Sequence, residues 1–190
     1  PGLTTVHADE REQLLAFLAN QRYVLRLAAH GLTDDQARLA PSASALSVGG
    51  LIKHVAATEA YWVDVVMQRQ APFEPGAAAE YEDGFRLVGD DTLRSVLDRY
   101  DEVAAETERV VRSLPLDHPV PVPEGVPWFP SDVEAWTLRW VVLHIIEETA
   151  RHAGHADIVR ESVDGGTWFA LMAAAEGSGP APWIEPWQPA

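Results

Sequence analysis

Histidines and one glutamate recur at helical spacing between residues 136 and 161. They are His144, Glu148, His152 and His155. On a helix, at about 100° per residue, these four side chains fall within an arc of roughly 80°. The apolar Val141 and Val159 share that arc, so the polar side chains face the core. Unpaired buried polar groups are costly, and a divalent metal ion would give three imidazoles and a carboxylate a common partner.

Glu148 and His152 are the first two predicted ligands, because residues four apart on a helix bring their β-carbons to about 5 to 6 Å. His54, on the inward stripe of another predicted helix, would complete a set of two imidazoles and one carboxylate. Such a set leaves coordination positions open for water or substrate. His144 and His155 could each replace a ligand. Alternatively, they could orient the ligands or carry a proton.

The helix that carries His54 should begin near Ser44 or Ser47 and run to about Arg69. Its inward stripe is Leu51, His54, Thr58, Tyr61, Trp62 and Val65. Gly49 and Gly50 lower helix propensity, so their expected use is to let another backbone or a ligand approach closely.

Three more long helices are predicted, together with shorter elements. The first begins at the capping pair Asp9 and Glu12, the third at Asp90 or Asp91, and the fourth at the capping pair Ser131 and Glu134. A turn at 33–39 and a short helix at 168–175 complete the helical segments. Residues 70–90 are expected to form a loop and 115–130 an extended crossover, and no strand is predicted. The sequence therefore indicates an all-α four-helix bundle in one domain, 1–190, with its core at about 8–175 and an irregular tail at 176–190.

Several other side chains are interpreted as structural. Trp128, Trp136 and Trp140 are expected to pack in the core or in loops rather than to form a stacking platform for nucleic acid. Asp157 and Arg160 are expected to be solvated surface residues. Trp183 and Trp187 are expected to dock the tail on the bundle.

Composition excludes several classes of partner. The chain has 29 acidic and 14 basic residues, for a net charge of −15, so neither nucleic acid nor an anionic membrane surface is an expected partner. The absence of a long apolar run and of a signal-like segment favours a cytoplasmic location. There is no cysteine, so any thiol chemistry needs a thiol from outside. A homodimer is compatible with the sequence, which does not decide the oligomeric state.

The segments WVVLHIIEETARHAGHADIVRE and GGLIKHVAATEAYWV resemble the DinB and YfiT-like metalloprotein superfamily. The similarity is greatest to its actinobacterial branch, which resembles the metal-binding domain of mycothiol-dependent maleylpyruvate isomerase. It implies a DinB-like four-helix bundle that holds zinc or nickel through His54, Glu148 and His152. No counterpart of the C-terminal domain of that isomerase is expected in this sequence.

This resemblance favours a metal-dependent transferase that activates a low-molecular-weight thiol, such as mycothiol, for attack on a small electrophile. His144 or His155 would carry protons or orient the ligands, and Arg139, Arg151 or residues 70–90 would hold the thiol. Two alternatives stay open. One is a metal-dependent hydrolase or isomerase without a thiol, and the other is a stress protein that binds metal or a small molecule without turnover.

Overall fold

The computed structural model describes residues 2–71 and 82–189, which are mostly helical. The long helices are α1 (Glu10–Leu27), α3 (Val48–Val66), α5 (Leu93–Ser113) and α6 (Leu138–Asp164). The shorter elements are α2 (Asp34–Arg38), α7 (Trp168–Ala175), β1 (Pro119–Pro121) and β2 (Ala135–Thr137). The predicted all-α bundle of four long helices is therefore confirmed.

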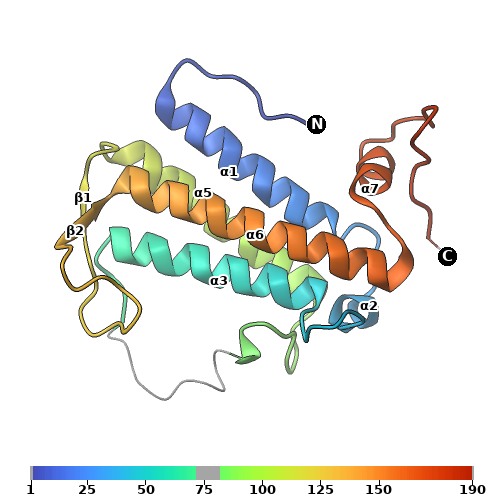
Figure 1. The fold of residues 1–190 in the computed structure, drawn as a ribbon, viewed down its shortest axis with the longest axis horizontal. Helices are drawn as coiled ribbons and strands as arrows, with labels where there is room; N and C mark the ends of the chain where they lie inside the picture. Colours follow the sequence, from blue (N-terminus) through green and yellow to red (C-terminus); the bar gives the residue numbers. More distant parts are fainter. Residues whose placement is uncertain (1, 72–81, 190) are drawn as a thin grey trace.

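The four long helices pack side by side, with α6 between α1 and α3 and with α5 against α3 (Figure 1). In this view α1 and α6 run in one direction, and α3 and α5 run in the opposite direction. The contact between α3 and α6 is therefore antiparallel. This contact matters for function because it brings the two helices with the predicted metal ligands together.

Local capping explains where most of these helices begin. The side chains of Asp9 and Ser47 accept hydrogen bonds from backbone N–H groups three residues later, as predicted from their types. The predicted cap of α5 was wrong, because Thr92 forms a capping box with Ser95. Asp91 does not cap the helix because its carboxylate accepts hydrogen bonds from Lys53 Nζ at 2.7 Å and from the Val88 N–H.

The start of α6 and the absence of strands were also wrongly predicted. Ser131 and Glu134 do not open the helix, which begins at Leu138 with Thr137 as its N-cap. The residues just before it form β2, which pairs antiparallel with β1. The reason is a long-range interaction: the N–H groups of Leu138 and Arg139 donate to the carbonyls of His118 and Leu116 in the proline-rich crossover.

A layer of buried polar side chains lies between two apolar clusters of the bundle core. Arg22 on α1 forms an ion pair with Glu59 on α3, with 2.5 Å between Arg22 Nη2 and Glu59 Oε1. The Thr107 hydroxyl on α5 donates to the same carboxylate oxygen, and Thr149 on α6 is fully buried. Each of the four long helices thus contributes to the polar layer.

Arg160 is buried, contrary to the expectation that it is a surface residue. Its guanidinium donates to the carbonyls of Ala28 and His30 and to the carboxylate of Asp164. Trp187 covers the same guanidinium, with 4.7 Å from its carbon to the ring centroid. One end of α6 is therefore tied to the end of α1 and to the C-terminal tail. Trp187 packs on the bundle as expected, whereas Trp183 stays 72% exposed.

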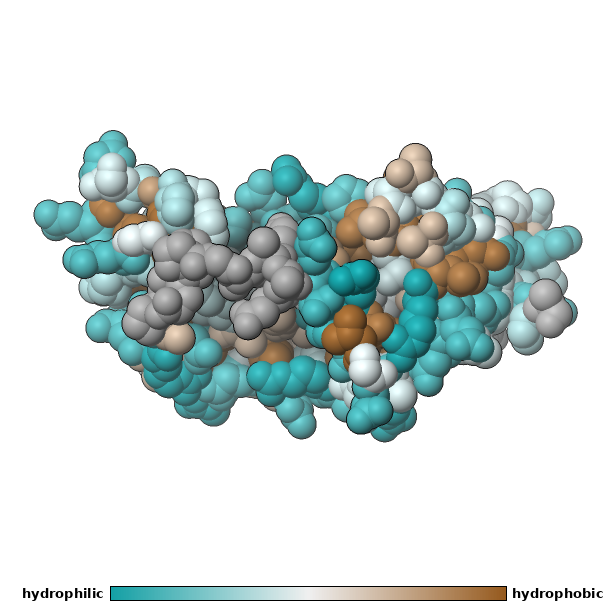
Figure 2. Space-filling view, turned by 90° about the horizontal axis from the view of Figure 1, so that it is seen from below, coloured by the Kyte–Doolittle hydropathy of each residue, from teal (hydrophilic) through white to brown (hydrophobic). Residues whose placement is uncertain are grey.

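The surface is mainly hydrophilic in the space-filling view, with hydrophobic side chains exposed in separate patches (Figure 2). This agrees with the high content of acidic residues. Within the described ranges, no helix has the length and apolar character needed to cross a membrane.

Candidate metal centre

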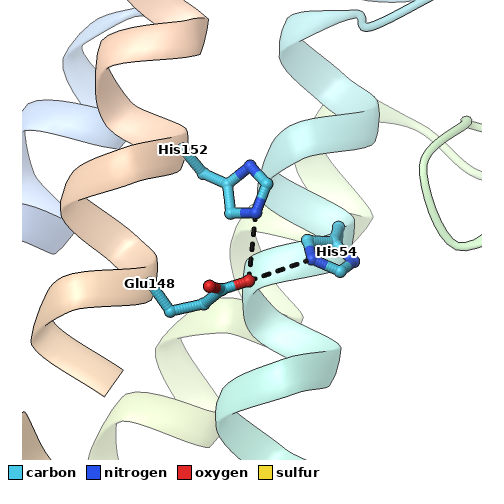
Figure 3. A group of neighbouring side chains, drawn as sticks. All are labelled: His54, Glu148 and His152. Carbon is cyan, nitrogen blue, oxygen red and sulfur yellow. Dashed lines mark hydrogen bonds and ion pairs between the residues drawn. The ribbon is translucent and has the colours of Figure 1, made fainter. Parts of the chain in front are cut away.

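The predicted ligands come together where α3 and α6 lie against each other. His54 extends from α3, and Glu148 and His152 extend from successive turns of α6, so that all three side chains point toward one another (Figure 3). The Glu148 Oε1 atom lies 3.1 Å from His152 Nε2 and 3.5 Å from His54 Nε2. Among the described residues, these three form a group whose ligand atoms all lie within 4.8 Å of one another.

The two separations from Glu148 Oε1 fit the donor set of one divalent ion. Two ligand atoms that each lie about 2.1 Å from a tetrahedral ion are roughly 3.4 Å apart, by simple geometry from typical zinc bond lengths. The observed 3.1 Å and 3.5 Å are close to this value. Two imidazoles and a carboxylate are also a ligand set that catalytic zinc sites use, with a further position left open. The cluster could therefore hold a metal ion.

Electrostatics keep the carboxylate in the form that binds metal. Hydrogen bonds from His152 and then from His54 lower the pKa of Glu148 far below its usual range and outweigh the opposing effect of partial burial. Glu148 is therefore ionised throughout the physiological range of pH. Its side chain is 25% exposed, against 15% for His54 and 10% for His152, so the site can be reached from solvent.

The ring of His54 is held in place by a segment that joins α3 to α5. Phe85 stacks on it, with 3.8 Å between ring centroids and 19° between ring planes. Thr58, one turn later on α3, has its hydroxyl 3.5 Å from His54 Nε2. Phe85 can come this close because Gly50 has no side chain: a Cβ there would lie 1.8 Å from the Phe85 carbonyl oxygen. The glycine pair therefore allows a close backbone approach, as predicted.

His155 and His144 occupy different positions relative to the cluster. The Nδ1 atoms of His155 and His152 lie 3.5 Å apart, so His155 contacts the side of the His152 ring opposite to the one that faces Glu148. This contact can orient His152 as a ligand. His144 packs instead against Trp62 and Trp140, with centroid distances of 4.7 Å and 5.3 Å.

Two contributors to the site were missed in the sequence. Phe85 lies in a loop without periodicity, and only the paired glycines on α3 signalled that a segment would pack there. The buried Arg22–Glu59 pair joins α1 to α3, the helix that carries His54, but both residues resemble ordinary surface charges in the sequence. Arg139, which was considered as a thiol-binding group, pairs with Glu10, with 2.6 Å between Nε and Oε1.

Comparisons with known proteins place this chain in a family. No curated protein sequence matches the chain. A crystal structure of a conserved protein from Enterococcus faecalis shares the fold, with a TM-score of 0.64 at 14% identity, over 84% of this chain and 100% of that one. The sequence model of the family described as mycothiol-S-transferase matches residues 13–165, which is most of the chain. The chain therefore belongs to the mycothiol-S-transferase family.

Proposed function

We propose that this protein is a divalent-metal-dependent transferase that joins the sulfur of mycothiol to a small electrophile. The observation that carries the proposal is the convergence of His54, Glu148 and His152 in a chain of the mycothiol-S-transferase family. The family indicates a transferase that uses mycothiol, and the cluster supplies a place where a metal ion could act on the thiol. Zinc is the proposed metal and nickel the alternative, because imidazole suits both.

The thiolate is the reactive form of a thiol, so the site must favour loss of the thiol proton. A divalent ion at this cluster would lower the pKa of a thiol in its open position. The protein's own part is to hold His54, Glu148 and His152 in place and to accept the proton. We propose that His144 accepts the thiol proton, because it lies one turn before Glu148 and is 29% exposed. His155 orients His152.

The transfer then balances as a substitution. The thiol proton passes to His144 and later to solvent, the sulfur lone pair forms a bond to the electrophilic carbon, and the leaving group departs with its bonding electrons. No oxidant or reductant is required. We place the reaction in the cytoplasm, where thiols are kept reduced.

The polar part of mycothiol has a suitable place on the side of α3 that faces α5. A groove of about 590 Å³ lies between α3 and α5. The polar residues among those that line it are Lys53, Asp64, Gln70, Asp91, Ser95 and Arg99. A hydroxyl-rich glycoside needs many hydrogen-bonding partners, and this lining supplies both donors and acceptors. We propose that the groove holds the glycoside while the sulfur reaches the cluster.

The test combines metal analysis with a thiol-dependent assay, on protein purified without a nickel column. The native chain should contain about one metal ion per chain and should conjugate a model electrophile only when mycothiol is added. His54→Ala should lose both properties, whereas His7→Ala, which alters an exposed histidine outside the cluster, should keep both. Turnover without thiol would support a hydrolase or isomerase instead. Metal without any turnover would support a binding protein, and a metal-free native chain would refute the proposal.

A further inference from the structure

A row of rings on α6 leads to the candidate metal centre. Trp136, Trp140 and His144 are spaced four residues apart, and the same spacing continues through Glu148 and His152. The rings of Trp136 and Trp140 are stacked, with 4.8 Å between centroids and 5° between planes. The rings of Trp140 and His144 are stacked as well, at 5.3 Å and 9°. We call these three residues the aromatic row.

Trp62 on α3 holds the aromatic row from the opposite side. Its ring meets those of Trp136, Trp140 and His144 at steep angles, with centroids 5.3 Å, 5.7 Å and 4.7 Å away. Trp62 is buried and lies two turns after His54 on the same ridge of α3. The aromatic row and the metal ligands therefore share one seam between α3 and α6, and the rings are fixed before any ligand arrives.

Much of this aromatic surface is not used in the core. Trp140, the middle ring of the aromatic row, is 40% exposed. Leu143, next to His144, is 48% exposed. Burying the whole of these side chains would be more favourable for folding than leaving them in water. Their exposure beside a reactive centre indicates a surface that binds a ligand.

We propose that the aromatic row binds the electrophilic substrate, and that this substrate is a neutral, planar aromatic compound. This inference rests on the proposed transferase function and adds the substrate class to it. A planar ring packed against the exposed edges of Trp140 and His144 would place an electrophilic carbon along the seam, toward the thiol sulfur at the metal ligands. Sulfur then bonds to that carbon, and the leaving group departs with the bonding electrons. An anionic compound is disfavoured by the exposed Glu147, whose carboxylate lies 3.9 Å from His144 Nδ1.

The first experiment measures binding without chemistry. Equilibrium dialysis of the zinc-loaded chain with 2,4-dinitrotoluene, which has no leaving group, is done in the absence of any thiol. Trp140→Leu keeps an apolar side chain but removes the ring, and it should weaken binding by roughly 3- to 10-fold, as expected for the loss of one aromatic pair. Trp183→Leu removes an even more exposed tryptophan from the tail and should leave binding unchanged. Trp140→Gln, which also removes the ring but suits a partly exposed position, gives a second variant should Trp140→Leu fail to fold.

The second experiment measures turnover with mycothiol. Trp140→Leu should lower kcat/KM for 1-chloro-2,4-dinitrobenzene by a similar factor and leave that for iodoacetamide, a small aliphatic electrophile, nearly unchanged. Three outcomes would overturn the inference. They are equal losses of kcat/KM for both electrophiles, unchanged binding of 2,4-dinitrotoluene by Trp140→Leu, and no binding of it by the native chain. Normal nitroaromatic binding without any thiol-dependent turnover would instead refute the transferase function and leave the aromatic site standing.

Discussion

At the scale of single residues, Glu148 is the group on which the candidate metal centre depends most. Its Oε1 atom faces both imidazoles, and hydrogen bonds from them hold its pKa down. A carboxylate contributes the negative charge of the donor set, and neutral imidazoles cannot replace that contribution. The adjacent Glu147 is exposed and lies outside the cluster, so the two glutamates form a natural comparison.

Glu148→Gln should weaken zinc binding by at least about 100-fold, because a direct ligand should matter more than an outer contact, whose loss typically costs 10- to 100-fold. The amide keeps the size of the side chain, so the fold should be unaffected. Zinc affinity measured by competition with a chelator at neutral pH checks this. Glu147→Gln is the control and should bind zinc like the native chain. Equal affinities for the two variants would argue against the assigned ligand set.

Asp157 is a second residue with an unusual environment. Burial, and to a lesser extent repulsion from Glu161, raises its pKa to about 6. A carboxyl group whose pKa is higher in the folded than in the unfolded chain favours folding in its neutral form. Its contribution is therefore complete below the unfolded pKa of about 3.9 and is lost as the pH rises through 6.

Asp157→Asn should raise the free energy of unfolding by about 1 to 2 kcal/mol at pH 8, since a shift of two pKa units sets an upper limit of about 2.7 kcal/mol. At pH 4 the gain should be absent. Urea unfolding at both pH values, with chelator present so that metal does not contribute, measures the difference. Asp132→Asn, at an exposed position, should change neither value. A gain of the same size at pH 4 would show that ionisation is not the cause.

At the scale of elements, α3 supplies the proposed ligand His54 and also the surface on which the loop before α5 rests. The close approach at Gly50 lets Phe85 reach the His54 ring, so the loop and the metal ligand are coupled through one glycine. A glycine inside a helix normally weakens it, and alanine at the same position should be better. The space around each glycine decides whether the better helix propensity of alanine or the clash of its Cβ prevails.

Gly50→Ala should lower the free energy of unfolding by about 1 to 3 kcal/mol, because the added Cβ would displace the Phe85 backbone from α3. Zinc binding should also weaken, because the His54 ring loses its stacked neighbour. Gly154→Ala on α6 is the matched control, since nothing lies within 4 Å of its added Cβ. Its free energy of unfolding should rise by about 0.5 to 1 kcal/mol, from helix propensity alone. Urea unfolding of both variants distinguishes these signs, and a gain for Gly50→Ala would contradict the close packing.

At the scale of the whole molecule, the polar layer links all four long helices at the level between the two apolar clusters. The Glu59 side chain is fully buried and that of Arg22 is 6% exposed. A buried ion pair does not by itself make a protein more stable than apolar packing would, but removing one partner leaves an uncompensated charge. The layer therefore makes the relative positions of the helices sensitive to single changes.

Glu59→Ala should lower the free energy of unfolding by about 3 to 5 kcal/mol, because Arg22 would lose its fully buried carboxylate partner and keep only the longer, partly exposed contact with Glu108 at 3.4 Å. The double variant Arg22→Met with Glu59→Leu should recover most of that loss, since it removes both charges and fills the space. Thermal unfolding of the two variants and of the native chain tests this. If the double variant were as unstable as Glu59→Ala, the cost would come from lost packing rather than from the unpaired charge.

Local sequence determined the long helices and the pairing of Glu148 with His152, because helical periodicity places residues four apart on the same face. Caps formed by Asp9 and Ser47 were likewise predictable, since they involve atoms three residues apart. The sequence also predicted His54 as the third ligand, from the inward stripe of its helix and from family resemblance. Its 3.5 Å approach to Glu148, however, depends on the antiparallel packing of α3 against α6.

Tertiary structure alone decided the features that depend on distant partners. Trp136 pairs in a strand because the crossover offers it a backbone partner, and α6 begins only where carbonyls of that crossover accept its first N–H groups. Arg160 is buried because the end of α1 and the tail supply carbonyls and a tryptophan for its guanidinium. Local periodicity cannot predict these features, because hydrogen-bond and packing partners that are far apart in the chain become neighbours only when the helices assemble.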